Sequence, residues 1–495
     1  MVKDKMLMVR LHFGFILCLI LCVTPAICEG QYTTNGTLYT IQSTGPVSNR
    51  LNIVIFSEGY TSNNLASHFL ADATNTMNNL FYWNPYQEYQ NYCNVYAIAV
   101  PSINRGSTHP LTGVTNNTFF GSSYDPYYDY VITIPTSGLT KMTNLLSSLM
   151  PSAGLPIILV NDSTDGGAGG PVDVVSTGSS LQIDIIPHET GHTLGKLQDE
   201  YDYGYSYSDL NLNIALAAAN TCHITNTITN TTWSATSTNS YKYLTNVTWS
   251  AWITNGTPIA TTNTAQYAGT VGLFQGANYT TVNWYRPQED CMMRTLGSPF
   301  CSVCSEALVK AICQKARPVD SYSPQTNSTL TITNATPVVF TLTQPQPLTH
   351  NLVTQWYTNG VAVVGGATNK TFTLTPGQFT NGNYTLQAQV HDPTPLVRTD
   401  PSNFLSATLT WNLAINVYKL NLDTLGLPKA SSLFHFRVSG NAPYGFIIQG
   451  ATNLIPTNGV NWYPLSTNFL TNGQFYYTNK VTNITRQFYR VRILP

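Results

Sequence analysis

The chain has 495 residues, a length that predicts about three domains, and only 9% of its residues are charged. Its 22 Lys and Arg against 23 Asp and Glu give a formal charge of −1, so there is no basic field to gather nucleic acid or anionic lipid. Apolar residues make up 42% and aromatic residues 12%, so we expect a folded chain with no nucleic-acid partner.

The first 28 residues have the order of a secretory signal peptide. Lys3, Lys5 and Arg10 precede an apolar run from Phe13 to Val23, and small residues follow it up to Cys28. The run is about half of the roughly 20 residues that a membrane span requires. We therefore expect a signal peptide at residues 1–28, no membrane span, and a secreted, extracellular protein.

Six cysteines remain beyond the signal peptide. An even number in an exported chain favours disulfide bonds, although the pairing cannot be deduced from the sequence. The spacing Cys301-x-x-Cys304 is also one that ligates a structural zinc ion, so this alternative stays open. The six are Cys93, Cys222, Cys291, Cys301, Cys304 and Cys313.

Strand and helix patterns alternate over residues 51–317, after a linker or N-terminal strand at residues 29–50. Residues 52–56 and 155–160 are short apolar runs typical of buried strands. Between them, residues 64–80 place apolar side chains at helical spacing. We expect residues 51–317 to form one α/β domain.

Beyond residue 317 the helical periodicity fades and apolar residues alternate, as half-buried strands require. The triplet Thr-Asn-Gly, a tight-turn signal, recurs at residues 358–360, 380–382, 457–459 and 471–473. A break near residues 417–429 divides this tail. We expect two all-β sandwich domains, an immunoglobulin-like one at residues 318–417 and a C-terminal one at residues 418–495.

The segment with chemical information is the HExxH motif of residues 188–192. On a helix, His188 and His192 share one face and can bind a single tetrahedral Zn²⁺. Glu189 then lies beside the metal, where it can act as a general base toward a water molecule. Pro187 limits the helix upstream unless it lies in the first turn, with Asp184 as the N-cap.

A third metal ligand is expected after the helix, because Gly195 can end it in a left-handed conformation and turn the chain back. Zincins with a glycine here usually have a histidine ten residues after the first ligand, but this chain has Gln198. We expect Asp199 to be the third ligand, with Glu200 as the alternative, since one of the two carboxylates could instead support a histidine.

Residues 188–201, HETGHTLGKLQDEY, resemble the HExGHxxxxLxDEY signature of the IgA peptidase family of zinc metallopeptidases. The resemblance extends over residues 51–317. It includes the strand and Glu-Gly-Tyr turn of residues 53–60, the stretch of residues 94–102, and residues 285–304 with their Asp-Cys-Met-Met-Arg and Phe-Cys-Ser-Val-Cys segments.

The resemblance implies an α/β zincin-like, specifically metzincin-like, catalytic domain with Met292 or Met293 in a turn beneath the metal. Ordinary core packing is the alternative for both methionines. The glycine-rich residues 165–170 could border a cleft and bind an extended peptide, or be a plain loop. Tyr285 could donate a hydrogen bond to the reaction intermediate, or be a buried structural tyrosine.

The expected function is that of a secreted zinc endopeptidase with Glu189 as general base, acting on a protein or peptide substrate. The alternatives are a catalytically silent zincin-like adhesin and a zinc amidase that acts on cell-wall peptides. The two C-terminal β domains are candidates for contact with a surface or a polysaccharide.

Overall fold

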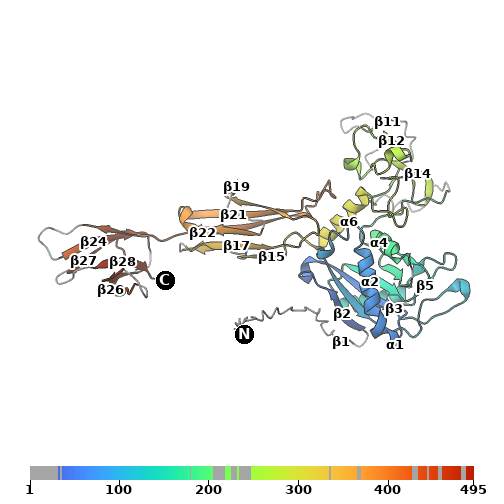
Figure 1. Ribbon diagram of the computed structural model, residues 1–495, viewed down its shortest axis with the longest axis horizontal. Helices are drawn as coiled ribbons and strands as arrows, with labels where there is room; N and C mark the ends of the chain where they lie inside the picture. The colour runs from blue at the N-terminus through green and yellow to red at the C-terminus, as the bar shows by residue number, and fades with distance from the viewer. Residues whose placement is uncertain are drawn as a thin grey trace, which may run out of the picture. The chain divides into compact units, whose positions relative to one another are not determined.

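The computed structural model describes residues 32–33, 36–178, 180–204, 218–224, 231–233, 247–333, 336–364, 370–425, 433–442, 445–454, 460–480 and 487–494 (Figure 1). The expected signal peptide and the Thr-Asn-Gly turn at residues 457–459 lie outside them. None of the helices in this part of the chain is both long and apolar enough to cross a membrane. The structure consists of several small sheets and few helices.

Two compact units account for the chain. The first comprises Met1–Ser43, Asn52–Tyr82 and Cys93–Thr193, and the second comprises Thr44–Leu51, Trp83–Tyr92 and Leu194–Pro495.

A seven-stranded sheet in the order β1-β2-β4-β3-β7-β9-β8 forms the centre of the first unit (Figure 1). Its strands are β1 Tyr32–Thr33, β2 Gly36–Gln42, β3 Leu51–Glu58, β4 Cys93–Ala99, β7 Leu155–Val160, β8 Gly167–Ala168 and β9 Asp173–Ser176. β3, β7 and β9 run parallel, whereas β8 pairs antiparallel with β9 at the sheet edge. The apolar runs at residues 52–56 and 155–160 were thus correctly predicted as strands.

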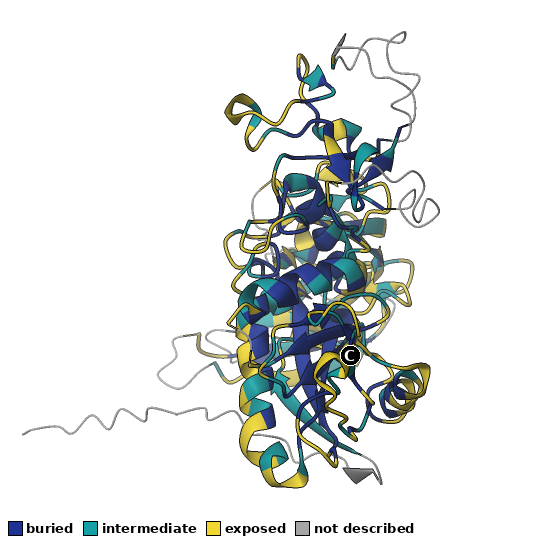
Figure 2. Ribbon diagram, turned by 90° about the vertical axis from the view of Figure 1, so that its right-hand side faces the viewer, coloured by how far each residue is buried: buried dark blue, intermediate teal, exposed yellow. Residues whose placement is uncertain are grey.

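Every residue of β3 is buried, so both faces of the sheet are covered there (Figure 2). Val54 and Phe56 join one core cluster, to which helix α3, Thr136–Leu149, contributes Met142, Leu145 and Leu149. Ile53 and Ile55 are equally buried and point to the opposite face, because side chains alternate along a strand.

Helices α2, Leu70–Leu80, and α4, Gln182–Thr193, contact each other. Gln182 connects them, since Asn79 Nδ2 donates to its Oε1 at 2.9 Å and its Nε2 donates to Thr76 Oγ1 at 3.2 Å. α2 continues from α1, Ser62–Asn64, through a π-helical segment, Leu65–Phe69. The helical pattern of residues 64–80 therefore predicted a real helix, but not its π-helical start. The strands β5, Ser123–Tyr124, and β6, Ile132–Thr133, pair nearby in sequence.

The second unit begins with short strands and one long helix. β10 Cys222–His223, β14 Thr280–Arg286 and β13 Phe274–Ala277 form one sheet, and β11 Thr231–Thr232 and β12 Pro258–Ile259 form another. Helix α6, Ser302–Lys315, follows and buries one side of its length. Short 3-10 helices lie at Val47–Asn49, Gln90–Tyr92, Ser250–Trp252, Ala265–Tyr267 and Pro376–Gln378, with one more at Pro110–Thr112 in the first unit.

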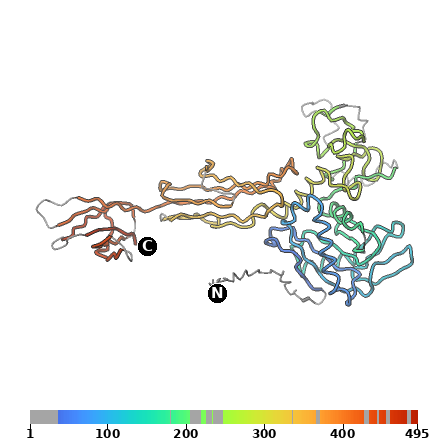
Figure 3. The backbone as a smooth tube through the Cα atoms, in the orientation of Figure 1, coloured from blue at the N-terminus to red at the C-terminus, as the bar shows by residue number. Residues whose placement is uncertain are grey.

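Beyond α6, the described strands form two sets of sheets, and Figure 3 traces the backbone of both. The first set holds β15 Ser321–Ser323, β17 Val338–Thr343 and β20 Thr371–Leu374, together with β16 Leu330–Ile332, β22 Ser406–Ile415, β21 Gly382–His391, β18 Val353–Thr358 and β19 Val361–Ala362. Trp356 is 1% exposed and stacks on Phe372 and Trp411, so it is a packed core residue.

The second set holds β23 Leu420–Thr424, β24 Leu433–Gly440 and β27 Gln474–Lys480, together with β26 Tyr463–Asn468, β25 Phe446–Ala451 and β28 Phe488–Ile493. Phe436, Val438, Phe446 and Ile448 are its buried core. The turn signals at residues 358–360 and 471–473 work as predicted, because Asn359 and Asn472 and the glycines that follow them all have positive φ. The signal at residues 380–382 does not, because Asn381 lacks a positive φ.

Candidate metal centre

Helix α4 carries the two histidines of the HExxH motif. Their Nε2 atoms lie 3.2 Å apart and the rings meet edge to face, 4.9 Å between centroids. Two nitrogens that each bind a tetrahedral metal at about 2.0–2.1 Å are separated by about 3.3 Å. The pair His188 and His192 therefore fits a shared tetrahedral metal ion.

The ends of α4 differ from what the sequence predicted. Pro187 lies inside the helix, and Asp184 lies in its first turn rather than at the N-cap. The helix extends upstream of the proline because Leu181 accepts hydrogen bonds from the amides of Asp184 and Ile185 and starts it early. After the helix, the left-handed residue is Lys196, with φ 53°, and not Gly195. Both of these expectations were wrong.

Glycines of the edge strand β8 and the loop after it lie against Glu189. A Cβ added to Gly167 would lie 3.1 Å from Glu189 Oε1 and 2.6 Å from Ile185 Cγ2. A Cβ added to Gly169 would lie 2.6 Å from both the Glu189 carbonyl oxygen and His192 Cβ. The glycines predicted to border a cleft thus allow the backbone to approach the HExxH face of α4 closely.

Asp173 in β9 supports α4 from the sheet. Its Oδ2 accepts a hydrogen bond from Thr190 Oγ1 at 2.7 Å, and the side chain is fully buried. Burial raises the pKa of Asp173 to about 7, although hydrogen bonds from Thr193 and Thr190 act in the opposite direction. No sequence motif marks this residue, because the contact joins a strand to a helix.

Asp199 follows the helix and lies in the second unit. The hydroxyl of Tyr279 donates to Asp199 Oδ2, and the Asn278 amide donates to the Asp199 carbonyl oxygen at 3.0 Å. Burial, with the charge of Asp199, raises the pKa of Tyr279, so this tyrosine remains a hydrogen-bond donor at neutral pH. Tyr279 is a site residue that the sequence reasoning missed, since 80 residues separate it from Asp199.

Glu200 points into a different cluster from Asp199. Its Oε1 accepts hydrogen bonds from Asn220 Nδ2 at 2.9 Å and from Cys304 Sγ at 3.1 Å. Burial raises the pKa of Glu200 well above its usual range.

Within the second unit, four described side chains have the types and spacing of metal ligands, with all ligand atoms within 4.8 Å of one another. They are Glu200, Cys291, Cys301 and Cys304.

Three further residues singled out from the sequence, Tyr285, Met292 and Met293, are buried. Tyr285 is 6% exposed, and β14 pairs it with Cys222 and Gln275. Met292 and Met293 are both fully buried, and the Met293 carbonyl accepts the Glu200 amide at 2.8 Å. The Met segment therefore holds the backbone of the Asp199–Glu200 segment in place.

Of the cysteines, Cys222, Cys291, Cys301 and Cys304 are free thiols. The expectation that they form disulfides is wrong for this structure. Cys222 pairs with Tyr285 in a sheet, and the other three gather around a carboxylate.

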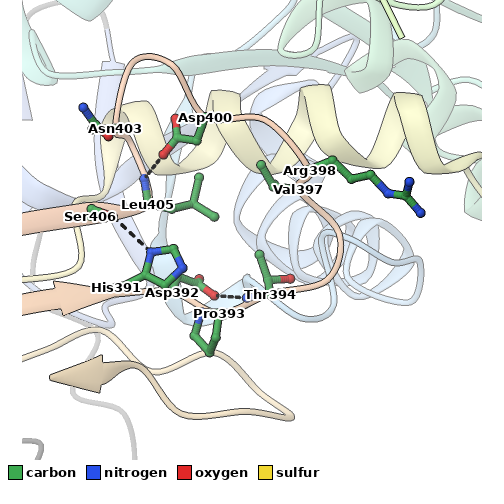
Figure 4. Close-up of a pocket in the computed structure, with 10 residues that line it drawn as sticks. All are labelled: His391, Asp392, Pro393, Thr394, Val397, Arg398, Asp400, Asn403, Leu405 and Ser406. Carbon is green, nitrogen blue, oxygen red and sulfur yellow. Dashed lines mark hydrogen bonds between the residues drawn. The ribbon is translucent and has the colours of Figure 1, made fainter. Parts of the chain in front are cut away.

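A surface pocket lies on the connection between β21 and β22 (Figure 4). Its two carboxylates are already engaged. Asp400 accepts the amides of Phe404 and Leu405, and Asp392 accepts hydrogen bonds from Tyr89 and the Thr394 amide. We assign no ligand to this pocket.

Among known proteins, a family model matches the N-terminal part of the chain. The family model for IgA Peptidase M64 matches residues 39–266 and 258–312, more than half of the chain. No curated protein matches the chain. A solved structure, of Clostridium thermocellum CbhA fibronectin(III)-like modules, is 8% identical, covers 32% of this chain and 77% of its own, and has a TM-score of 0.15. A score this low supports no statement about the fold.

Proposed function

The chain belongs to the IgA Peptidase M64 family, and on that basis we propose that it is a secreted, zinc-dependent endopeptidase. The observation that carries the proposal is the 3.2 Å separation of the His188 and His192 Nε2 atoms on α4, with Glu189 between them in sequence. This spacing suits one tetrahedral ion, and the neighbouring carboxylate suits a general base.

We propose His188, His192 and Asp199 as the zinc ligands. Zinc held there would polarise a peptide carbonyl and acidify a water molecule. Glu189 would take a proton from a water molecule beside it and later deliver that proton to the leaving amine. Tyr279 orients the Asp199 carboxylate by its hydrogen bond, and Asp173 fixes α4 through Thr190.

The substrate is proposed to be a peptide in extended conformation. Gly167 and Gly169 let the backbone of β8 and the following loop pass close to Glu189, so a peptide bound along this edge of the sheet would lie near the general base. An edge strand can bind such a segment by adding it to the sheet. A position beside the general base would bring the scissile bond near the reacting groups.

The domain arrangement is likewise proposed. Residues 51–317 would form the zincin-like peptidase domain, residues 318–417 an immunoglobulin-like domain, and residues 418–495 a C-terminal β domain that contacts a surface or a polysaccharide. The support is the composition of the sheets, since among the described residues beyond β15 every long element is a strand. Export is supported by the sequence of residues 1–28.

The test incubates the purified protein with a denatured protein mixture and identifies new termini by mass spectrometry. Glu189→Ala should lower cleavage about 100- to 10,000-fold while the bound zinc stays near the wild-type level. Glu289→Gln, which changes a half-buried glutamate far along the chain, should cleave like the wild type. Removal of zinc by a chelator should abolish cleavage, and added zinc should restore it.

Cleavage by Glu189→Ala at the wild-type rate would refute the mechanism. Bound zinc without any new termini would favour a silent binding protein. Release of amines from a cell-wall peptide alone, with no protein cleaved, would favour an amidase.

A further inference from the structure

Four buried side chains of the second unit converge on one point away from the HExxH motif. They are Glu200, Cys291, Cys301 and Cys304, which are 0%, 0%, 3% and 0% exposed. Their ligand atoms all lie within 4.8 Å of one another. Three thiols and a carboxylate are a set of ligands that zinc accepts.

Helix α6 brings two of the cysteines together. Cys301 is the N-cap of the helix, and its Sγ accepts the Cys304 amide at 3.4 Å. Cys291 Sγ accepts the Cys301 amide at 3.2 Å. Amide donors at a helix N-terminus stabilise negative charge on sulfur, which is the form that binds a metal.

The carboxylate of Glu200 is only partly satisfied by hydrogen bonds. Glu200 Oε1 is bonded to Asn220 and Cys304, but Oε2 is buried and has no hydrogen-bond partner among the described residues. A buried carboxylate oxygen without a partner is costly, and a cation would satisfy it.

Two arginines supply positive charge around the cluster. Arg286 is fully buried, and among the described residues its guanidinium donates only to neutral oxygens, those of Gln275, Gly276, Glu289 and Asn263. Its charge interacts with that of Glu200. Arg294 donates to the Glu200 carbonyl oxygen at 2.8 Å. Three thiolates and a carboxylate around one divalent ion carry a net charge of about two minus, which these cations offset.

We propose that Glu200, Cys291, Cys301 and Cys304 bind a second, structural zinc ion. With zinc–sulfur distances of about 2.3 Å, two sulfurs of a tetrahedral site lie about 3.8 Å apart, which the 4.8 Å limit of the cluster accommodates. A disulfide would use only two of the three sulfurs and would leave the carboxylate uncompensated. Four protein ligands also fill the coordination shell, so the ion has no open position for substrate.

The site would hold together segments that are distant in sequence. Cys304 is 104 residues beyond Glu200 in sequence, and a shared zinc ion would link both residues to Cys291. Because Glu200 adjoins Asp199, it would also fix the backbone that carries the proposed third ligand of the peptidase centre. The inference does not depend on peptidase activity.

The test counts zinc in the full-length protein by elemental analysis. We expect about two zinc ions per chain in the wild type and about one in the double variant His188→Ala/His192→Ala. Adding Cys291→Ser to that double variant should remove the remaining ion. Cys222→Ser, which changes a buried thiol outside the cluster, should leave the count unchanged.

Cobalt substitution gives a second reading that does not rely on a folded cysteine variant. Cobalt in the His188→Ala/His192→Ala protein should show the intense near-ultraviolet absorption of thiolate ligation. Absence of that absorption would overturn the proposal, as would a purified wild type with one zinc ion whose peptides show a disulfide among Cys291, Cys301 and Cys304. Loss of cleavage in the double variant, with its zinc retained, separates this site from the peptidase centre.

Discussion

The carboxylates of Asp199 and Glu200, neighbours in sequence, bind different partners. The Tyr279 hydroxyl donates to Asp199, whereas Asn220 Nδ2 and Cys304 Sγ donate to Glu200. One short segment therefore contributes to two separate clusters. Substituting each carboxylate separately can therefore show which of the two is the third metal ligand.

Asp199→Asn should weaken zinc binding at the peptidase centre by at least about 100-fold, because a neutral amide replaces a charged ligand. Glu200→Gln should leave that affinity within about threefold of the wild type. Competition with a chromophoric chelator measures both values, in a Cys291→Ser background that removes the cluster. The reverse order of the two effects would make Glu200 the ligand.

The local parts of the site could be predicted from the sequence, and the long-range parts could not. The spacing of His188 and His192 places them on one face of any helix, because helical geometry depends only on neighbouring residues. The buried strand β3 and the Asn-Gly turns at Asn359 and Asn472 could be predicted for the same reason, because each depends on a short run of neighbouring residues.

Tertiary contacts decided the rest. Tyr279 is 80 residues from Asp199 in sequence, and Cys304 is 104 residues from Glu200. A local sequence pattern therefore cannot predict either contact. Pro187 was expected near the helix start because it lacks an amide proton, but the helix begins upstream of it, where Leu181 accepts the first amides and Gln182 bonds to α2. At Pro187, tertiary packing of the helix thus outweighs the preference of proline for the first turn.

Gly169→Ala should damage the peptidase centre without changing any reacting group. The new Cβ would lie 2.6 Å from the Glu189 carbonyl oxygen and from His192 Cβ, and neither atom belongs to a flexible side-chain end. We expect a loss of about 1–3 kcal/mol in the free energy of unfolding and a fall in cleavage of about 100-fold. Denaturant titration and a peptide assay measure the two effects.

Gly377→Ala is the matched control for that substitution. A Cβ at Gly377 would meet nothing within 4 Å, so its stability and activity should equal those of the wild type. Wild-type cleavage by Gly169→Ala would show that the backbone has more room beside Glu189 than the structure gives it.

Asp173 should make folding stability depend on pH. Its pKa is raised from 3.8 to about 7 by burial, so the folded chain holds a proton that the unfolded chain releases between about pH 4 and pH 7. Stability contributed by this group is then present at low pH and is lost as the pH rises through that window. The full effect is on the order of 4 kcal/mol.

Asp173→Asn should remove this part of the slope, since an amide does not titrate. Denaturant unfolding at pH 4.5 and pH 7.5, with a chelator present so that metal release adds nothing, compares the two proteins. Equal slopes for the wild type and the variant would mean that Asp173 is ionised in the folded chain.

His350 bridges two buried carboxylates in the second unit. Its Nδ1 lies 2.8 Å from Glu88 Oε1 and its Nε2 lies 2.7 Å from Asp392 Oδ1. Glu88 and Asp392 are 6% and 2% exposed, so removal of the ring leaves two buried acids facing each other. His350→Ala should therefore cost roughly 3 kcal/mol in the free energy of unfolding.

His391 provides the comparison, because it is exposed and bonds only to Ser406 Oγ among the described residues. His391→Ala should cost less than about 0.5 kcal/mol. Glu88→Gln/Asp392→Asn, introduced together with His350→Ala, should recover much of the loss, since neutral amides do not repel each other. If His350→Ala costs no more than His391→Ala, the bridge contributes nothing, and the contact between the Trp83–Tyr92 segment and the first β set must rest on its other contacts, such as the hydrogen bond from Tyr89 to Asp392.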